Sequence, residues 1–159
     1  MDVFDEEILA FWRQLDQQSV RYIMLGGFAT SFHGFSRVTD DMDLWLEDTL
    51  ENRRRLRQAI KIHGSGDYEP LERVQFIPGW TELRLLSGFK VDLMTTVKGL
   101  ESLSFDECYN MAAVAEIEGV RVRFLDYNHL IESKKAANRL KDQLDVEELE
   151  KIRRLAEEK

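Results

Sequence analysis

The stretch Gly26–Leu46, GGFATSFHGFSRVTDDMDLWL, decides how we expect this chain to fold. Just before it, the apolar run Tyr22–Leu25 is stopped by two glycines, which is typical of a buried strand entering a tight turn. Near its end, apolar residues alternate with Asp41 and Asp43, which predicts a second strand. Residues 28–33 favour a short helix between the two strands.

Outside this stretch, hydrophobic periodicity predicts further helices and hairpins. We expect helices over about residues 4–18, 49–63 and 104–112, and two more over 127–157 that are separated near Asp142–Asp145. We expect hairpins with turns at Ser87-Gly88 and Glu118-Gly119. The predicted fold is α+β, with a mixed sheet of about five strands, flanking helices and a short C-terminal helical segment. We expect one domain over residues 1–159.

Composition narrows the functional classes. The 159 residues are 43% hydrophobic and 33% charged, as in a globular protein, and the formal net charge of -8 disfavours unselective binding to nucleic-acid phosphates. The single cysteine, Cys108, excludes an internal disulfide framework and a Cys-rich zinc site, so we expect a reducing, cytoplasmic location. The acidic start does not resemble a signal peptide, and no apolar run approaches the roughly 20 residues of a membrane span, so we expect no membrane association.

Three carboxylates carry the chemical signal. Asp41 and Asp43 are two apart on a predicted strand, so both side chains leave the same face, with Cα atoms about 7 Å apart. Such close carboxylates repel each other, and a bound cation relieves the repulsion. Oxygen ligands favour Mg²⁺ or Mn²⁺ over zinc. Asp92 lies in the apolar run Val91–Met94, where an acid faces solvent, caps a neighbour or binds metal. The alternative for the Asp41/Asp43 pair is a solvated strand edge.

The spacing of these residues resembles a known family. Gly26-Gly27, a spacer, then Asp41-Met42-Asp43-Leu44 and a later Asp92 resemble the signature of the polymerase-β-type nucleotidyltransferase superfamily. Within it, the chain is most similar to small bacterial nucleotidyltransferase-like proteins, including the toxin component of AbiE-type abortive-infection systems. That likeness rests on His33-Gly34, on Arg37-Val38-Thr39-Asp40-Asp41, and on a second motif of Lys134, Ala137, Arg139, Lys141, Asp142 and Asp145.

The resemblance implies metal-dependent nucleotidyl transfer from a nucleoside triphosphate such as ATP. Asp41, Asp43 and Asp92 would be catalytic and would hold two Mg²⁺ or Mn²⁺ ions, with Asp92 also available as a base. The acceptor hydroxyl would belong to an RNA, a protein or a small molecule.

Four further residues would contact the nucleotide in this interpretation: Gly26, Gly27, Arg37 and Lys134. Each has a structural alternative. The two glycines can simply form a tight turn, Arg37 can neutralise the acids, and Lys134 can extend its stem over the core with its ammonium in water. Arg139 and Asp142 can pair with each other.

Several functions stay open at this level. The same chemistry would serve a general enzyme or a toxin of a toxin–antitoxin system that acts on tRNA and is held by an antitoxin partner. A non-catalytic, nucleotide-binding regulatory module is the alternative from another class, although such a module needs no cluster of repelling acids. The basic run Arg53–Arg57 is typical of a solvated helix face, or alternatively of an RNA-facing patch.

Overall fold

A computed structural model describes residues 3–77 and 80–158 of the chain. Its helices are α1 (Val3–Gln17), α2 (Gly26–Phe32), α3 (Leu50–His63), the short 3₁₀ helix η1 (Glu69–Glu72), α4 (Phe105–Met111), α5 (Tyr127–Ala137) and α6 (Leu140–Glu157). Its strands are β1 (Tyr22–Met24), β2 (Asp41–Leu46), β3 (Glu82–Arg84), β4 (Lys90–Met94), β5 (Ala113–Ile117) and β6 (Val120–Phe124). The prediction of an α+β fold is confirmed.

All of these strands form one mixed sheet. The order is β3-β4-β2-β1-β6-β5, six strands rather than the predicted five or so. Both predicted hairpins are present, β3 with β4 and β5 with β6, and each is antiparallel. The central pairs β2–β4 and β1–β6 are parallel, while β1 and β2 are antiparallel. Strand β5 pairs along its whole length with β6 and forms one edge of the sheet.

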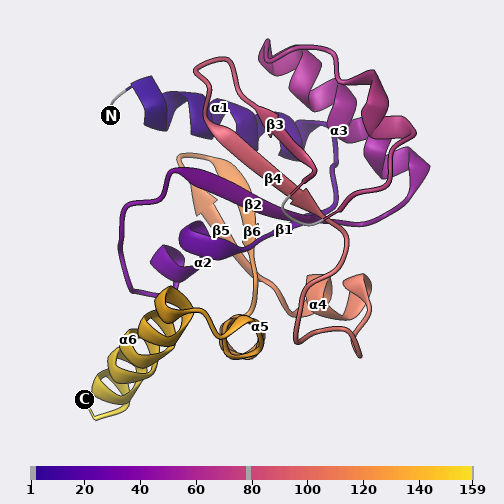
Figure 1. The fold of residues 1–159 in the computed structure, drawn as a ribbon. Helices are drawn as coiled ribbons and strands as arrows, with labels where there is room; N and C mark the ends of the chain where they lie inside the picture. Colours follow the sequence, from indigo (N-terminus) through magenta and orange to yellow (C-terminus); the bar gives the residue numbers. More distant parts are fainter. Residues whose placement is uncertain (1–2, 78–79, 159) are drawn as a thin grey trace.

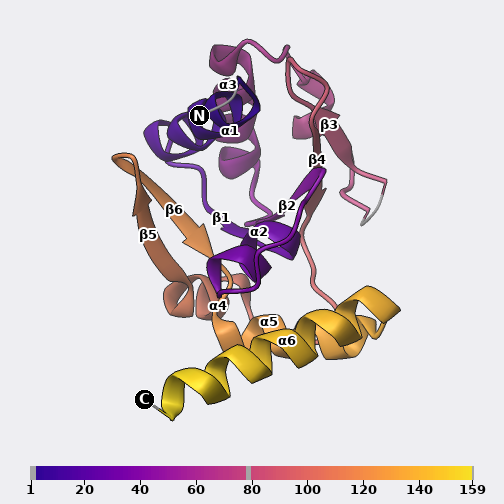
Figure 2. The ribbon, with the colours of Figure 1, turned by 90° about the vertical axis from the view of Figure 1, so that its left-hand side faces the viewer.

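The strongly twisted sheet separates two groups of helices (Figures 1 and 2). Helices α1 and α3 pack against each other on one side, whereas α2, α5 and α6 lie on the opposite side. Met42 and Leu44 of β2 are fully buried in the core, so Asp41 and Asp43 point to the other face of the strand. No helix within residues 3–77 and 80–158 has the length and apolarity to cross a bilayer.

Helix α3, Leu50–His63, closely matches the helix predicted over about residues 49–63. The Thr49 side chain accepts a hydrogen bond from the backbone NH of Asn52, and Gly64 ends the helix with φ 92°. Its basic run Arg53–Arg57 is paired with acids: Arg53 with Asp48, Arg54 with Glu72, Arg55 with Glu51, and Arg57 with Asp67 and Glu72. This pairing favours the interpretation of a solvated helix face over an RNA-facing patch.

Two predicted helix boundaries are wrong. Helix α2 begins at Gly26 instead of residue 28, so the two glycines form its first turn. The break between α5 and α6 lies at Asn138 and Arg139 instead of Asp142–Asp145. Asn138 adopts a left-handed conformation with φ 53°, and the backbone NH and guanidinium of Arg139 donate hydrogen bonds to the Asp142 carboxylate at the start of α6. The predicted break residues are therefore inside a helix.

Candidate active site

The parallel pairing of β2 with β4 brings the three predicted acids together. In this register Asp43 lies directly beside Asp92, and Asp41 lies beside Lys90. One carboxylate oxygen from each of Asp41, Asp43 and Asp92 lies within 4.8 Å of the others. Asp40, on the opposite face of the strand, is exposed and is not part of this acid trio. The structure thus joins two neighbouring acids with a third from about fifty residues further along the chain.

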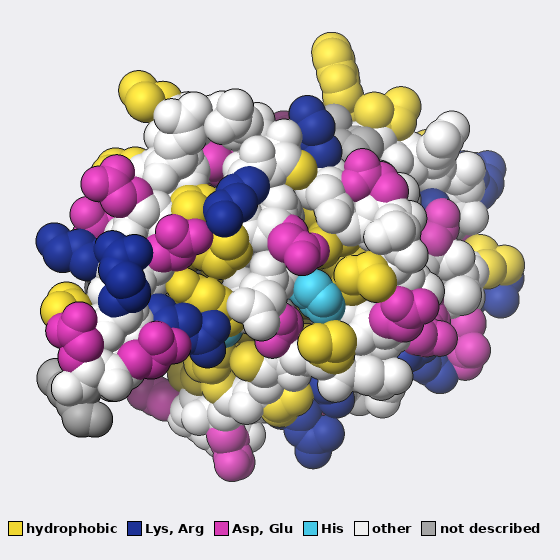
Figure 3. Space-filling view, turned by 90° about the horizontal axis from the view of Figure 1, so that it is seen from below, with side chains coloured by type: hydrophobic (Ala, Val, Ile, Leu, Met, Phe, Trp, Pro, Cys, Tyr) yellow, Lys and Arg dark blue, Asp and Glu magenta, His cyan; other side chains and the backbone are white. Residues whose placement is uncertain are grey.

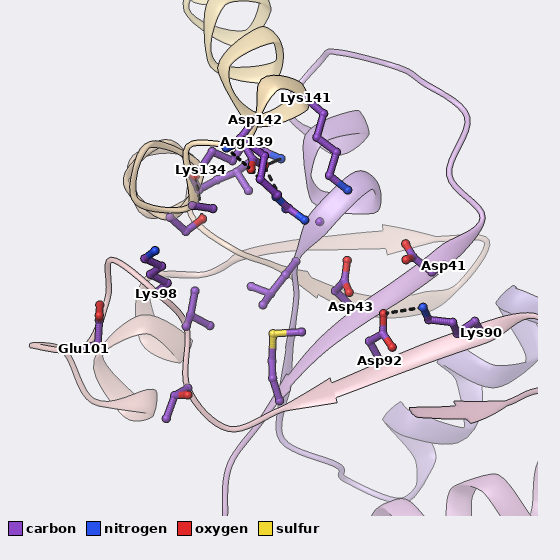
Figure 4. Close-up of a pocket in the computed structure, with 18 residues that line it drawn as sticks. Asp41, Asp43, Lys90, Asp92, Lys98, Glu101, Lys134, Arg139, Lys141 and Asp142 are labelled. Carbon is purple, nitrogen blue, oxygen red and sulfur yellow. Dashed lines mark hydrogen bonds and ion pairs between the residues drawn. The ribbon is translucent and has the colours of Figure 1, made fainter. Parts of the chain in front are cut away.

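The acid trio opens onto a pocket of about 650 Å³ (Figure 4). Figure 4 shows Arg139 and Lys141 reaching from the start of α6 toward the carboxylates, while Lys98 and Glu101 come from the loop after β4. The strands supply acids on one wall, and the helices and loop supply cations on the others. The pocket therefore places negative and positive groups opposite each other.

Crowding and burial change how these acids ionise. Burial, together with the charges of Asp41 and Asp92, raises the pKa of Asp43 to about 6. Burial also raises the pKa of Asp92, against the opposing effect of the Lys90 ammonium 3.6 Å away. The other oxygen of Asp92, Oδ1, is buried and has no hydrogen-bond partner among the described residues. A buried acceptor without a partner is costly, and a bound cation would satisfy it.

The residues fit a hard divalent cation. All ligand atoms in the trio are carboxylate oxygens, the type that Mg²⁺ and Mn²⁺ prefer. Two oxygens on one octahedral Mg²⁺ lie about 3–4 Å apart, close to the spacing of the trio. Asp41, Asp43 and Asp92 are therefore able to hold such an ion after small side-chain adjustments.

Gly26 is required by the acid trio itself. Its backbone has φ 61°, and a Cβ atom at this position would lie 2.1 Å from Oδ2 of Asp43. A Cβ on Gly27 would lie 2.8 Å from the side chain of Thr39, whose hydroxyl donates to the carbonyl oxygen of Asp41. The two glycines thus let the start of α2 approach β2 and the residues that precede it closely.

Lys134 and Arg37 meet at one buried carboxylate. The Lys134 ammonium is 2.8 Å from Oδ2 of Asp145 and 3.9 Å from Asp142, and the Arg37 guanidinium is 2.9 Å from the same Asp145 oxygen. Lys134 and Asp145 are 6% and 1% exposed, so this lysine does not extend its ammonium into water. Burial alone would raise the pKa of Asp142, but hydrogen bonds from Arg139 bring it below its ordinary value.

Lys134 and Arg37, two of the predicted nucleotide-binding residues, lie beside the acid trio, but both already form ion pairs. Lys134 lines the main pocket, while Arg37 lines a smaller hollow of about 90 Å³ beside it, together with Gly26 and Gly27. Both cations are committed to Asp145, which ties α5 and the segment before β2 to α6. Nε of Arg37 is buried without a hydrogen-bond partner in the described part of the chain.

Lys98 and Lys141 line the pocket but were not among the predicted nucleotide-binding residues. Within residues 3–77 and 80–158, neither Lys98 nor Lys141 makes an ion pair shorter than 4.0 Å, and both line the pocket. Lys141 belongs to the quoted second motif, but nothing in the sequence places Lys98 near the acids. On the face seen from below, acidic and basic side chains are interspersed (Figure 3). That face offers an acceptor no broad charged surface.

Comparisons with known proteins identify the fold. No family model matches this chain, and no curated protein matches it. A candidate nucleotidyltransferase from Thermotoga maritima has a similar solved structure, with a TM-score of 0.61 and 16% identity over 98% of this chain and 94% of that one. The antibiotic-resistance factor ANT(2″)-Ia, whose solution structure reveals substrate-regulated conformational dynamics, also has a TM-score of 0.61 and 16% identity. That match covers 94% of this chain and 83% of the other. The chain therefore has a nucleotidyltransferase-like fold.

Replacing Gly26 by alanine should disturb Asp43 directly. Gly119 is the matched control, since it also has a positive φ, 79°, but an added Cβ meets nothing within 4 Å. We expect Gly119→Ala to cost about 1–2 kcal/mol from backbone strain alone, and Gly26→Ala to cost about 1–3 kcal/mol more from the clash. Urea unfolding without metal measures both values, and equal costs would contradict the close approach.

The raised pKa of Asp43 predicts a pH effect on the metal-free protein. The folded state holds this proton up to about pH 6, whereas an unfolded aspartate loses it near pH 4, so folding binds the proton between these values. The stability contributed by this group is therefore lost as pH rises from about 4 through 6. In EDTA, wild type should lose stability over that range relative to Asp43→Asn. Parallel curves for wild type and Asp43→Asn would refute the expectation.

Proposed function

We propose that this protein transfers a nucleoside monophosphate from a nucleoside triphosphate to a hydroxyl group, with Mg²⁺ or Mn²⁺ as cofactor. The observation that carries the proposal is the acid trio of Asp41, Asp43 and Asp92 at the wall of a 650 Å³ pocket. The nucleotidyltransferase-like fold supports it. A non-catalytic binding module would gain nothing from three acids whose charges oppose one another.

The reaction is an in-line displacement at the α-phosphorus. The acceptor oxygen forms a bond to phosphorus, the bond to the bridging oxygen of the β-phosphate breaks, and pyrophosphate leaves with that electron pair. A bound divalent ion supplies charge neutralisation of the phosphate oxygens and lowers the pKa of the acceptor hydroxyl. Asp92, with its unpartnered Oδ1, is the proposed acceptor of the hydroxyl proton.

The nucleotide contacts divide into two kinds. We propose that Gly26 and Gly27 allow close approach of the phosphates and that Lys134 and Arg37, held by Asp145, form the wall beside them. Lys98 and Lys141 are the cations free to pair with triphosphate oxygens, since they are not neutralised by a neighbouring acid. We propose an RNA, a protein or a small molecule as the source of the acceptor hydroxyl.

Label transfer tests the activity and its dependence on the acid trio. Purified protein is incubated with each α-labelled ribonucleoside triphosphate, Mg²⁺ or Mn²⁺, and either total RNA or a cell extract. We expect transfer by wild type and a loss of at least about 100-fold in Asp41→Ala/Asp43→Ala, because the ligand oxygens stabilise transition-state charge by several kcal/mol.

Asp40→Ala is the matched control, because it removes an adjacent carboxylate that is exposed and outside the trio. It should transfer label like wild type. Equal transfer by the double variant would rule out the proposed catalytic role of Asp41 and Asp43. No label on any acceptor, despite metal-dependent nucleotide binding, would favour the binding module.

We further propose that the chain acts as an AbiE-type toxin held by an antitoxin partner. The support is the second motif, whose Lys134, Asp142 and Asp145 form one buried ionic cluster beside the pocket. We expect expression without a partner to arrest growth of a bacterial host, and Asp41→Ala/Asp43→Ala at the same protein level to be harmless. Growth unaffected by active wild-type protein would contradict the toxin role while leaving the transferase proposal standing.

A further inference from the structure

A second hollow lies at the opposite end of β1 from the acid trio. It has a volume of about 270 Å³, and four of its lining residues are arginines: Arg21, Arg55, Arg121 and Arg123. Arg21 precedes β1, whereas Gly26 follows it, and five residues of extended chain span about 17 Å. The hollow shares no lining residue with the pocket at the acid trio. It is therefore a separate concentration of positive charge in a chain whose net charge is -8.

One aromatic ring holds two of these arginines in place. The guanidinium carbon of Arg21 lies 4.5 Å from the ring centre of Tyr109, and that of Arg123 lies 4.1 Å from it. Arg21 also pairs with Asp106 and Glu47. Arg123 has no carboxylate partner within the described residues, so Tyr109 orders its guanidinium without neutralising the charge. Ordered but uncompensated charge is the property of a preformed anion site.

Of the other two arginines, only Arg121 adds to this surplus. The Arg121 side chain is exposed and makes no hydrogen bond or ion pair to any residue in 3–77 or 80–158, although Glu116 is its neighbour across the β5–β6 pair. The Arg55 guanidinium forms an ion pair with Glu51 and also donates a hydrogen bond to the carbonyl oxygen of Ser19. Asp16 is the single carboxylate among the described residues that line the hollow.

A buried hydroxyl group also faces this site without a partner. Tyr22 lines the hollow and is 3% exposed, and its hydroxyl has no hydrogen-bond partner by ordinary geometry among the described residues. Burial raises the pKa of Tyr22, so the group is a neutral donor at physiological pH, even though the backbone of Arg123 opposes the shift. A buried donor of this kind is satisfied by an acceptor atom of a ligand.

We propose that this hollow binds a phosphate group, carried either by a free small phosphate or by an RNA backbone. Guanidinium groups match phosphate oxygens with paired N–H donors, and a phosphate offers enough oxygens for Arg21, Arg121 and Arg123 at once. The Tyr22 hydroxyl donates to a further oxygen. The site is independent of the proposed transferase activity, and it binds without the metal that the acid trio requires.

Metal-free binding measurements test the proposal on the full chain. Pyrophosphate is titrated calorimetrically, and a short labelled single-stranded RNA is titrated by fluorescence anisotropy, both in EDTA at low ionic strength. We expect saturable binding by wild type and at least about tenfold weaker binding by Arg121→Gln/Arg123→Gln, since the variant lacks two guanidinium groups that would form charge-assisted hydrogen bonds to phosphate oxygens.

The control is Arg13→Gln/Arg154→Gln, which removes the same two charges at exposed positions outside the hollow. It should bind like wild type. If Arg121→Gln/Arg123→Gln binds pyrophosphate more weakly than wild type does, the ligand is a small phosphate. If only its binding of RNA is weakened, the ligand is the backbone of a nucleic acid. Tyr22→Phe should weaken the binding of the same ligand several-fold. Absence of binding by wild type, or equal affinities of the two double variants, would overturn the proposal.

Discussion

The parallel pairing of β2 with β4 is the constraint on which the candidate active site depends. This register places Asp43 beside Asp92 and brings Asp41 within reach of both, so three carboxylates share one face of the sheet. On the other face, Met42 and Leu44 are packed in the core, and their burial fixes which face of the strand carries the acids. The hydrophobic effect thus holds like charges together, and the raised pKa of Asp43 is the consequence.

The space around the acids follows from small residues and buried ion pairs. Gly26 and Gly27 let α2 begin against Asp43 and Thr39, in positions where a Cβ atom would collide. On the opposite wall, Asp145 binds both Lys134 and Arg37 and so joins three separate parts of the chain. Removing one partner of such a buried cluster leaves another charged group without compensation. Lys134, Arg37 and Asp145 therefore stabilise the fold as well as bordering the pocket.

Positive charge in this acidic chain has three uses. The arginines of α3 are paired with surface acids, and Lys134 and Arg37 are held in a buried cluster. A third group among the described residues lines the two cavities and makes no ion pair shorter than 4.0 Å: Lys98 and Lys141 at the main pocket, and Arg121 and Arg123 at the second hollow. Uncancelled cations favour anionic ligands at both places, and we propose that binding requires a metal ion at the acid trio but not at the second hollow.

Local rules were enough to predict much of this protein. The two-residue spacing of Asp41 and Asp43 defined their common face, and the helix predicted over about 49–63 matches α3, because strand and helix periodicity act over a few residues. Tertiary structure alone decided the pairing of Asp43 with Asp92, the capture of Lys134 and Arg37 by Asp145, and the presence of Lys98 in the pocket. These features join residues far apart in the chain. Periodicity within one segment predicts its secondary structure but not which other segment will pack against it.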